Sequence, residues 1–397
     1  IKVNDIILDY VKFKTPELQA LLDKFRTIEL DPKETKGGFA HSVTYKGMQT
    51  DFGLGGLHGA RSGIFEAKNG MIIMSSDVVS YYPNLAIKNK WAPAHLPKEE
   101  FCEQYEWFFT ERKKIPKKDP KNYVYKIILN STYGLSNDKN RFLYDPEFTM
   151  RITINGQLSL CMLYEMIAEG IPGSIPIMQN TDGLEMMIPE EHKAKYLEIC
   201  SEWETITQLA LEHDQYQKMI IGDVNNYIGI YDNGKTKCKG RFEFEELPLH
   251  KNKSNLVIPK AWFEYFVNGT DPKEYLMTNR NIFDYCTGSK IKGNWFFVER
   301  GVKDGMFYEN KLQKLVRYFV SKKGTKIIKC NPDGRQIQLE SGPILQTIFN
   351  KAVELPWEEY DIDEKYYLDK IYDEIKKIES TSEVIPQNMY QQLKLEL

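Results

Sequence analysis

The chain has 397 residues, 42% of them hydrophobic and 13% aromatic, a composition that predicts a folded globular protein of two or three subdomains. It contains no apolar run of membrane-spanning length and does not begin like a secretory signal, so we expect a soluble protein without a membrane partner. Its six cysteines are scattered without a C-x-x-C pair, which argues against zinc and iron–sulfur sites and predicts a cytoplasmic location.

The net charge of −3 argues against a nucleic-acid partner, but the charges are strongly segregated. Residues 112–126 carry seven Lys and Arg against one acid, and residues 311–329 carry seven with no acid. The mostly acidic stretch 354–383 offsets them in the total. Localised basic stripes are typical of proteins that bind a phosphate backbone, whereas one such stripe alone is also compatible with a solvated helix face.

The expected elements mix helices and strands without regular βαβ alternation. The first half predicts a helix at 16–26, a glycine-rich segment at 53–59, a buried strand at 71–76, and helices at 97–112, 123–135 and 148–169, with a basic turn at 116–122. The second half predicts strands at 174–179, 184–188, 218–222, 227–231 and 237–244, a helix at 190–213, and a mainly helical pattern beyond about residue 260 that ends with a helix at 366–378. This mixture predicts an α+β fold in which helices back an antiparallel sheet.

The strand at 71–76 ends at a carboxylate, Asp77, which Ser80, Tyr82 and Pro83 follow closely. A carboxylate at a strand end can lean into a cleft, and the backbone after it can offer a carbonyl oxygen to the same hard cation. An ordinary aspartate at a strand-to-turn junction is the alternative.

A cationic helix face follows in the sequence. Lys126, Asn130 and Tyr133 are three and four residues apart, so they share one face of the predicted helix. The ammonium group could hold phosphates there, while the amide and the ring border a bound base. A basic amphipathic helix without such a role is the alternative.

A second carboxylate, Asp182, stands in the turn Asn180-Thr-Asp-Gly183 between two predicted strands. Two carboxylates that are distant in sequence, can converge on divalent metal ions and face a cationic helix are what phosphoryl transfer requires. Glu185 is expected to stay outside a metal site, and Asn180 is also ordinary turn chemistry.

These three stretches, in this order, resemble motifs A, B and C of the family B DNA polymerases. The first matches D-x-x-S-L-Y-P except at Tyr81, and the second matches K-x-x-x-N-S-x-Y-G in full. The third departs from D-T-D-S at Asn180 and at Gly183. The loss of the first acid leaves the strength of the activity open.

The resemblance implies a role for each matched residue. Asp77, Asp182 and Lys126 would be catalytic, with Asp77, Asp182 and the Val78 carbonyl as ligands of two Mg²⁺ ions, for which Mn²⁺ could substitute. The implied nucleotide-binding residues are Arg112, Lys126, Asn130, Tyr82, Ser80 and Val79, where Arg112 grips the γ-phosphate and Tyr82 excludes a 2′-hydroxyl. The implied DNA-binding residues are Tyr133, Gly134, Thr181, Tyr227, Lys237, Lys239, Gly55 and Gly56.

Two of these DNA-binding assignments depend on weaker matches. Residues 226–240 resemble the family's basic strand pair that holds the primer end, and residues 53–59 resemble its glycine-rich loop that touches the template. A structural hairpin and a glycine turn are the respective alternatives.

The implied architecture is a right-handed polymerase with an antiparallel-sheet palm, short helical-hairpin fingers and a mainly helical thumb. Its expected parts are an N-terminal segment at 1–70, palm at 71–97 and 141–260, fingers at 98–140, and thumb at 261–397. The exonuclease motifs of the family are not found before Asp77, and the stretch before it is too short for a nuclease domain. Only 49 residues separate Asp77 from Lys126, and 52 separate Asn130 from Asp182, which leaves no room for the insertions of protein-primed relatives.

The expected function is template-directed addition of dNTPs to a primer 3′ end. The implied partners are primer-template DNA and dNTPs, with a separate exonuclease domain or processivity factor as a further candidate. Compactness and a composition rich in Lys, Ile, Asn and Tyr suggest a virus or phage, hence host cytoplasm. Two alternatives stay open: a catalytically weakened polymerase module that binds DNA or scaffolds a replication complex, and a primer-independent nucleotidyltransferase.

Overall fold

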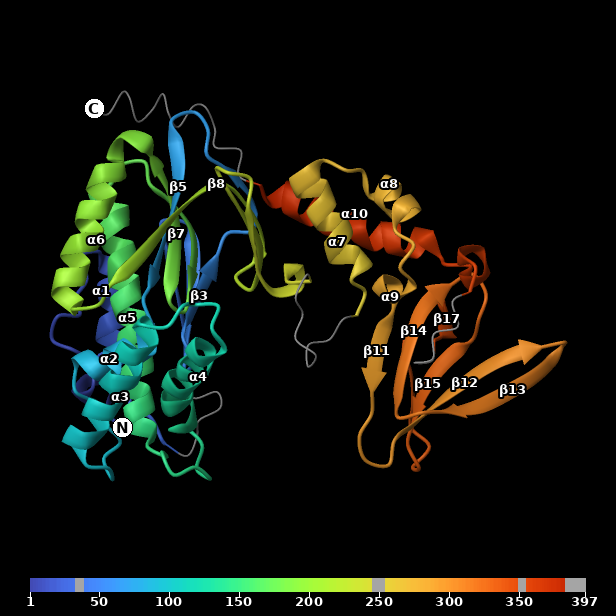
Figure 1. The fold of residues 1–397 in the computed structure, drawn as a ribbon, viewed down its shortest axis with the longest axis horizontal. Coiled ribbons are helices and arrows are strands. Elements are labelled where there is room, and N and C mark those ends of the chain that lie inside the picture. The colour runs from blue at the N-terminus through green and yellow to red at the C-terminus, as the bar shows by residue number, and fades with distance from the viewer. Residues whose placement is uncertain (33–38, 245–253, 349–354, 383–397) are drawn as a thin grey trace. The chain divides into compact units, whose positions relative to one another are not determined.

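A computed structural model describes residues 1–32, 39–244, 254–348 and 355–382. Within them the chain forms two compact units (Figure 1). The first comprises Ile1–Val224 and Gly229–Lys237, and the second comprises Asn225–Ile228 and Cys238–Ser382. None of the helices in the described residues is long and apolar enough to cross a membrane.

The first unit is built on one large sheet with the strand order β1-β2-β3-β6-β7-β5-β8-β9-β10, in which β4 also pairs with β8. Its strands are β1 (Ala40–Tyr45), β2 (Met48–Gly53), β3 (Leu57–Ala60), β4 (Gly63–Glu66), β5 (Met71–Val78), β6 (Ile175–Asn180), β7 (Gly183–Pro189), β8 (Leu211–Asp223), β9 (Asn226–Tyr231) and β10 (Thr236–Cys238). The central strand β5 is antiparallel to both β7 and β8. It is buried along nearly its whole length, because it has neighbours on both edges and helices pack against the sheet.

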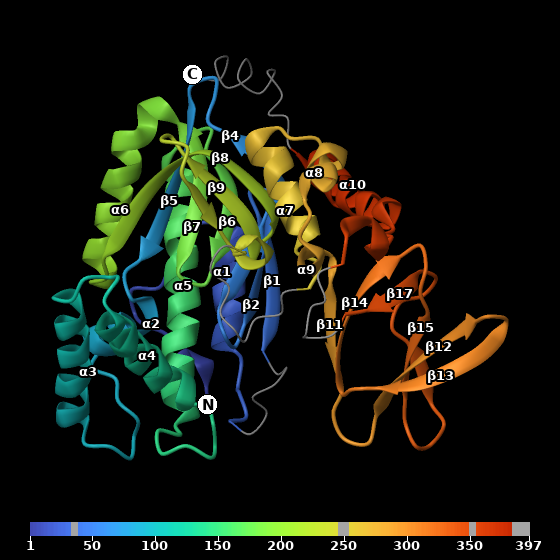
Figure 2. The same ribbon diagram turned by 45° about the vertical axis from the view of Figure 1, so that its right-hand side comes forward.

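The helices of the first unit are α1 (Pro16–Arg26), α2 (Tyr81–Lys88), α3 (Lys98–Lys113), α4 (Pro120–Leu135), α5 (Pro146–Gly170) and α6 (Lys193–Thr207). Two short 3-10 turns, η1 (Val3–Asp5) and η2 (Glu190–His192), accompany them. Aspartate side chains cap α4 and α5, since Asp119 accepts from the Lys121 backbone N–H and Asp145 from that of Phe148. Helices α5 and α6 lie along the sheet (Figures 1 and 2).

Helix α5 is the centre of the core, and most of its residues are buried. Two of its buried polar side chains hold the N-terminal segment. Glu165 accepts hydrogen bonds from the backbone N–H groups of Lys14 and Thr15 at 2.9 and 2.7 Å. Asn155 accepts from the Leu8 N–H at 2.8 Å and donates to the Ile6 carbonyl at 2.7 Å. These bonds satisfy groups that would be costly to bury alone.

The second unit combines short helices with two small sheets. Its helical elements are η3 (Gly240–Phe242), α7 (Val257–Phe263), the π-helical turn η4 (Glu264–Asn268), α8 (Pro272–Thr278), α9 (Ile282–Tyr285), η5 (Trp357–Tyr360) and α10 (Glu364–Thr381). Its strands are β11 (Thr287–Lys290), β12 (Phe296–Lys303), β13 (Met306–Leu312), β14 (Leu315–Ser321), β15 (Lys326–Cys330), β16 (Gln336–Gln338) and β17 (Ile344–Thr347). They form sheets with the orders β11-β14-β17 and β13-β12-β15-β16.

The prediction of helices and antiparallel strands in one chain is therefore confirmed, but the mainly helical pattern expected beyond about residue 260 is wrong. Seven strands lie within the described part of that range. In β14 the exposed Leu315 and Arg317 alternate with the buried Val316 and Tyr318, which is the period of a strand rather than of a helix. Residues 349–354 and 383–397 of that range lie outside the described residues.

Three smaller predictions are corrected at glycine or turn positions. The helix expected at 190–213 ends at Thr207, because Gln208 has a left-handed φ of 60°. The strand expected at 237–244 stops at Cys238, before Gly240 with its φ of 64°. The glycine-rich segment 53–59 does contain a strand start, since Gly59 lies in β3, where an added Cβ would meet the Gln49 carbonyl at 2.7 Å.

Candidate active site

Strands β5 and β7 bring the two predicted carboxylates onto adjacent backbone positions. Asp77 near the end of β5 is the register partner of Gly183, which directly follows Asp182. The Val78 N–H donates to the Asp182 carbonyl at 2.7 Å, so the β6–β7 turn is fixed to the end of β5. The backbones of Asp77 and Asp182 therefore lie close together at this edge of the sheet.

The carboxylate of Asp77 lies over a glycine and beside a lysine. A Cβ added at Gly183 would collide with Asp77 Oδ1, so the missing side chain at 183 makes room for this carboxylate. Lys237 Nζ donates to Asp77 Oδ2 at 3.3 Å and lies 5.9 Å from the ring centroid of Tyr216. Lys237, expected to hold a primer end, thus partners the carboxylate that the motif resemblance assigns to metal.

A cavity of about 520 Å³ opens next to Asp182. It brings together side chains from α2 and the residue before it, from α3 and α4, and from the β6–β7 turn. The residues that line it are Ser80, Tyr81, Tyr82, Pro83, Arg112, Lys126, Asn130, Tyr133, Thr181 and Asp182. Two cations and a carboxylate therefore share one cavity with aromatic rings.

The guanidinium group of Arg112 is held in a fixed orientation at this cavity by two side-chain hydrogen bonds. Its Nη1 donates to Ser80 Oγ at 3.0 Å, and its Nε donates to Asn122 Oδ1 at 3.2 Å. Burial lowers the pKa of Arg112, which still remains protonated at any working pH. The remaining guanidinium donors can bind an anion with little loss of side-chain entropy.

Tyr82 is packed from three directions. Its hydroxyl donates to the Gly55 carbonyl at 2.9 Å, and its ring meets that of Tyr133 edge to face with centroids 4.8 Å apart. A Cβ added at Gly156 of α5 would lie 2.9 Å from Tyr82 Cε1. Gly56 lies against the same tyrosine and Thr181, because its Cβ would fall 3.1 and 3.2 Å from their oxygens. The glycine-rich segment therefore supports the floor of the cavity.

Glu185 is enclosed in the sheet behind Asp77. It is 3% exposed, and Ser75 Oγ donates to its Oε1 at 3.2 Å. Its Oε2 has no hydrogen-bond partner within the described part of the chain. Burial raises the pKa of Glu185 to about 8, and the nearby negative charge of Asp77 acts in the same direction.

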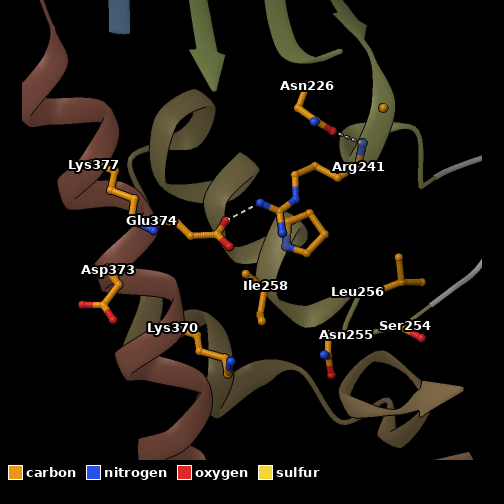
Figure 3. A pocket seen from close by; sticks show the side chains of 12 residues that line it. Asn226, Arg241, Ser254, Asn255, Leu256, Ile258, Lys370, Asp373, Glu374 and Lys377 are labelled. Atoms are coloured by element: carbon orange, nitrogen blue, oxygen red, sulfur yellow. Dashed lines mark hydrogen bonds and ion pairs between the residues drawn. The ribbon is translucent and has the colours of Figure 1, made fainter. Parts of the chain in front are cut away.

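A second cavity, of about 750 Å³, lies within the second unit (Figure 3). Arg241 Nη1 forms an ion pair with Glu374 Oε2 at 2.6 Å, and the Arg241 backbone N–H donates to Asn226 Oδ1 at 2.9 Å. Lys370, Asp373 and Lys377 of α10 also line this cavity. Because its cations are largely offset by carboxylates, the cavity has no marked preference for a phosphate group.

Comparison with known proteins gives a consistent assignment, although no family model matches the chain. DNA polymerase 1 of Saccharolobus solfataricus is 26% identical over 183 residues, which cover 44% of this chain and 19% of that protein. DNA polymerase 1 of Sulfolobus acidocaldarius is 31% identical over 117 residues, or 29% of this chain and 13% of that protein. A solved family B DNA polymerase from Pyrobaculum calidifontis aligns with a TM-score of 0.42 and 14% identity, over 80% of this chain and 46% of the other.

This chain is similar in sequence to archaeal DNA polymerases. The resemblance to a DNA polymerase seen in the three motifs is thereby confirmed. The matched stretches span less than a fifth of the length of the two curated relatives.

The polymerase-motif residues divide into two groups by position. Ser80, Tyr82, Arg112, Lys126, Asn130, Tyr133, Thr181 and Asp182 line the cavity of the first unit. The lining does not include Asp77, Val78, Val79, Gly134, Gly55, Gly56, Tyr227, Lys237 or Lys239. Of these, Tyr227 is buried and accepts a backbone hydrogen bond from Lys239, whose side chain is exposed.

Sequence reasoning missed Asn122 and the enclosed position of Glu185. Asn122 is 7% exposed although it lies in the first turn of a basic helix. Its burial depends on how the preceding helix α3 packs against α4, and the spacing of residues within α4 does not distinguish it from a surface asparagine. Glu185 offers a signal, since it is the one charged residue of β7, Gly183–Pro189.

Proposed function

We propose that this chain is a DNA polymerase that adds deoxynucleotides to a primer 3′ end under the direction of a template. The observation that carries the proposal is the cavity shared by Lys126, Arg112, Asp182 and Tyr82. It combines cations for a triphosphate with a carboxylate at the end of the sheet and aromatic faces for a base. The similarity to archaeal DNA polymerases supports the same substrate class.

In this proposal Arg112 and Lys126 bind the oxygens of the incoming triphosphate. Arg112 is held by Ser80 and Asn122, so its free donors can form bidentate bonds to a phosphate. Lys126 is a point charge on the facing helix, and it is the candidate to give a proton to the departing pyrophosphate. Asn130 and Tyr133 border the base of the incoming nucleotide.

Tyr82 is the proposed selector of the sugar. Its hydroxyl is fixed by Gly55 and its ring by Tyr133 and the close backbone of Gly156. A ring held in this way cannot retreat to admit a 2′-hydroxyl. The site would therefore favour deoxynucleotides over ribonucleotides.

The donor set fits two magnesium ions. Asp77, Asp182 and the Val78 carbonyl are hard oxygen ligands at adjacent backbone positions, and magnesium is often held by one or two carboxylates plus substrate phosphates. The described residues contain no group of three or more acidic, His or Cys side chains that would bind a metal unaided. Bound there, such ions would lower the pKa of the primer hydroxyl and neutralise charge on the triphosphate.

The proposed division of the chain keeps the palm at 71–97 and 141–260, the fingers at 98–140 and the thumb at 261–397. Primer-template DNA and dNTPs are the proposed partners, with a separate exonuclease domain or processivity factor as a further one. The proposed location is the cytoplasm. For a protein of a phage or mobile element, this is the cytoplasm of the host.

The test is primer extension with Mg²⁺, four dNTPs and the variants Asp77→Asn and Asp182→Asn. Each variant should extend at least about a hundredfold more slowly, because several kcal/mol of charge stabilisation are lost. Glu198→Gln is the control, since this carboxylate forms only an exposed ion pair with Lys195. Extension by Asp182→Asn at the wild-type rate would contradict the proposal.

A second candidate function is a DNA-binding module with weakened catalysis. Two observations favour it: Lys237 partners Asp77, and Asn180 donates through Nδ2 to the Val224 carbonyl at 3.0 Å. Wild-type protein that binds a primer-template but does not extend it would select this candidate. Extension with ribonucleotides as fast as with deoxynucleotides would instead select a nucleotidyltransferase without a sugar gate.

A further inference from the structure

The hairpin formed by β12 and β13 ends in three large apolar side chains that are exposed to solvent. Val302 is 70% exposed, Met306 71% and Phe307 68%. They flank the two-residue turn Asp304–Gly305, whose φ angles of 51° and 78° suit a tight hairpin. We call these three side chains and the turn the hairpin tip. Figures 1 and 2 both show the hairpin extending past the neighbouring strands of its sheet.

Packing within the unit does not account for the hairpin tip. Strand β12 pairs with β15 only as far as Arg300, opposite Lys326, so its last three residues have β13 as their partner strand. The small apolar cluster of this sheet, made of Val298, Ile328 and Cys330, lies at the base of the hairpin. Polar residues at the tip would be compatible with this fold. Grouped apolar side chains that are exposed to solvent usually mark an interaction site.

The register places the tip side chains on both faces of the hairpin. Val302 is directly opposite Phe307 on one face, and Met306 lies opposite Lys303 on the other. Tyr308 lies across Gly301, where an added Cβ would come within 2.9 Å of the ring. The tip is therefore an apolar wedge with an aromatic ring rather than a single flat patch.

The surroundings of the tip are strongly basic. Residues 287–347, which contain β11 to β17 and which we call the β module, carry twelve Lys and Arg against five Asp and Glu, a balance of +7. Most of these cations are exposed. On the hairpin itself Arg300 pairs with Glu309, Lys303 is exposed next to the turn, and Lys311 is exposed nearer the base, opposite Val298.

The positive charge of the β module distinguishes between the ligands that could bind the hairpin tip. An apolar patch that binds a second copy of the chain or another protein does not need surrounding positive charge. In a dimer through this surface, two β modules of charge +7 would repel each other. A nucleic-acid strand offers a polyanionic backbone together with flat apolar base faces, which is the combination that basic surfaces with aromatic side chains bind. Base faces inside a duplex are covered by their neighbours, so the accessible ones belong to unpaired nucleotides.

We propose that the hairpin tip stacks against unpaired nucleobases of a nucleic-acid strand whose phosphates the β module holds. Phe307 supplies the stacking face, and Val302 and Met306 widen it as apolar wedges do at unstacked base steps. The inference deepens the proposed polymerase function, because it names the single-stranded part of the substrate as the ligand of this surface.

The test measures binding of the full chain to short labelled strands by fluorescence anisotropy. The probes are oligothymidine, an abasic strand of equal length and a blunt duplex. Wild-type protein should bind oligothymidine more tightly than the abasic strand. Phe307→Ser should weaken binding to oligothymidine about tenfold, the factor expected for one stacked base, and should leave binding to the abasic strand unchanged.

Three further variants make the result specific. Phe307→Trp should retain tight binding because it keeps a stacking ring. The double variant Val302→Ser with Met306→Ser should lose part of the affinity for oligothymidine. It provides a second test of the tip if Phe307→Ser folds poorly. Met277→Ser is the matched control, since Met277 is 60% exposed on α8 outside the β module, and it should bind like wild type.

Two results would overturn the inference. One is equal binding of oligothymidine by Phe307→Ser and wild type, or an equal loss on the abasic strand, which would assign the effect to phosphate contacts or to folding. The other is a dimer of the wild-type chain by light scattering that Phe307→Ser dissociates, which would assign the tip to a second copy. Single-nucleotide primer extension by the same variants tests the polymerase proposal separately. The extension reaction can fail even when the hairpin tip still binds nucleobases.

Discussion

Asp77 and Glu185 show how one strand pair gives two carboxylates different properties. Asp77 lies at the end of β5, half-buried, with Lys237 as its partner. Glu185 lies two register positions further into the sheet, where water does not reach either oxygen. Ser75 supplies one hydrogen bond, and the ionised form has little else to stabilise it. The low effective dielectric therefore favours the protonated acid.

This burial predicts a pH-dependent stability. The pKa of Glu185 rises from an ordinary value of 4.5 to about 8 in the folded state. Below pH 4.5 the carboxyl is protonated in both states, so it adds no pH dependence. Between 4.5 and about 8 only the folded state keeps the proton, so the free energy of unfolding falls as the pH rises, by roughly 1.4 kcal/mol per pH unit at most, and levels off above about 8.

Glu185→Gln should remove most of this slope, and above pH 8 the variant should be more stable than the wild type by up to a few kcal/mol. Urea unfolding between pH 5 and 9 measures it. Glu190→Gln, an exposed carboxylate just after the end of β7, should leave the slope unchanged. A wild-type slope that survives in Glu185→Gln would mean that another group titrates.

At the scale of elements, the helical hairpin of α3 and α4 is closed by one side chain. Asn122 Nδ2 donates to the carbonyls of Arg112 and Ile115 at 3.2 and 2.8 Å, groups at the open C-terminal end of α3. Its Oδ1 accepts from Arg112 Nε. The same residue, in the first turn of α4, thus binds the end of α3 and orients the arginine of the cavity.

Asn122→Ala should destabilise the protein by about 1–3 kcal/mol, because two partly buried carbonyls each lose a hydrogen bond from its side chain. It should also raise the KM for dNTP several-fold, since Arg112 loses one of its two side-chain anchors. Thermal unfolding and steady-state extension measure the two effects. Asn140→Ala is the control: Asn140 is exposed and bonds only within its own loop, to Asp138. If Asn122→Ala leaves both quantities unchanged, the hairpin does not depend on this side chain.

The strands of the second unit do have turn signals in the sequence. The range beyond residue 260 contains Asp304-Gly305 and Asp333-Gly334, both followed by strands, and each is a typical hairpin turn signal. The many lysines between them obscured the alternation of buried and exposed residues. Helix α10, with its apolar residues Tyr367, Ile371, Ile375 and Ile378 at helical spacing, was predicted at 366–378 and is confirmed.

At the scale of the molecule, the net charge of −3 hides a β module of +7. Binding to a primer-template should therefore depend steeply on salt, since a protein that contacts about six phosphates loses roughly a thousandfold in affinity between 50 and 200 mM salt. Filter binding across this range measures the slope.

Lys322→Gln with Lys323→Gln should reduce that slope by about 0.9 for each phosphate that the protein no longer neutralises. Asp77→Asn with Asp182→Asn should leave the slope nearly unchanged, because in the proposed site those residues act on the reacting atoms rather than on the bound backbone. Affinity that does not vary with salt would contradict a phosphate-binding β module.

The sequence by itself determined the order of the three motifs, the buried strand before Asp77, the turn before Gly183 and the helix that carries Lys126. These features depend on local periodicity and on turn residues, which act over a few positions. They were sufficient to indicate the family and the residues around the cavity.

Only the tertiary structure decided which side chains meet. That Lys237 partners Asp77, that Asn122 holds Arg112, that Glu185 is sealed from water and that Phe307 is left exposed all depend on how the elements pack together. The physical reason is that burial, hydrogen-bond partners and local dielectric are properties of packed neighbours. A residue's own sequence context does not contain them.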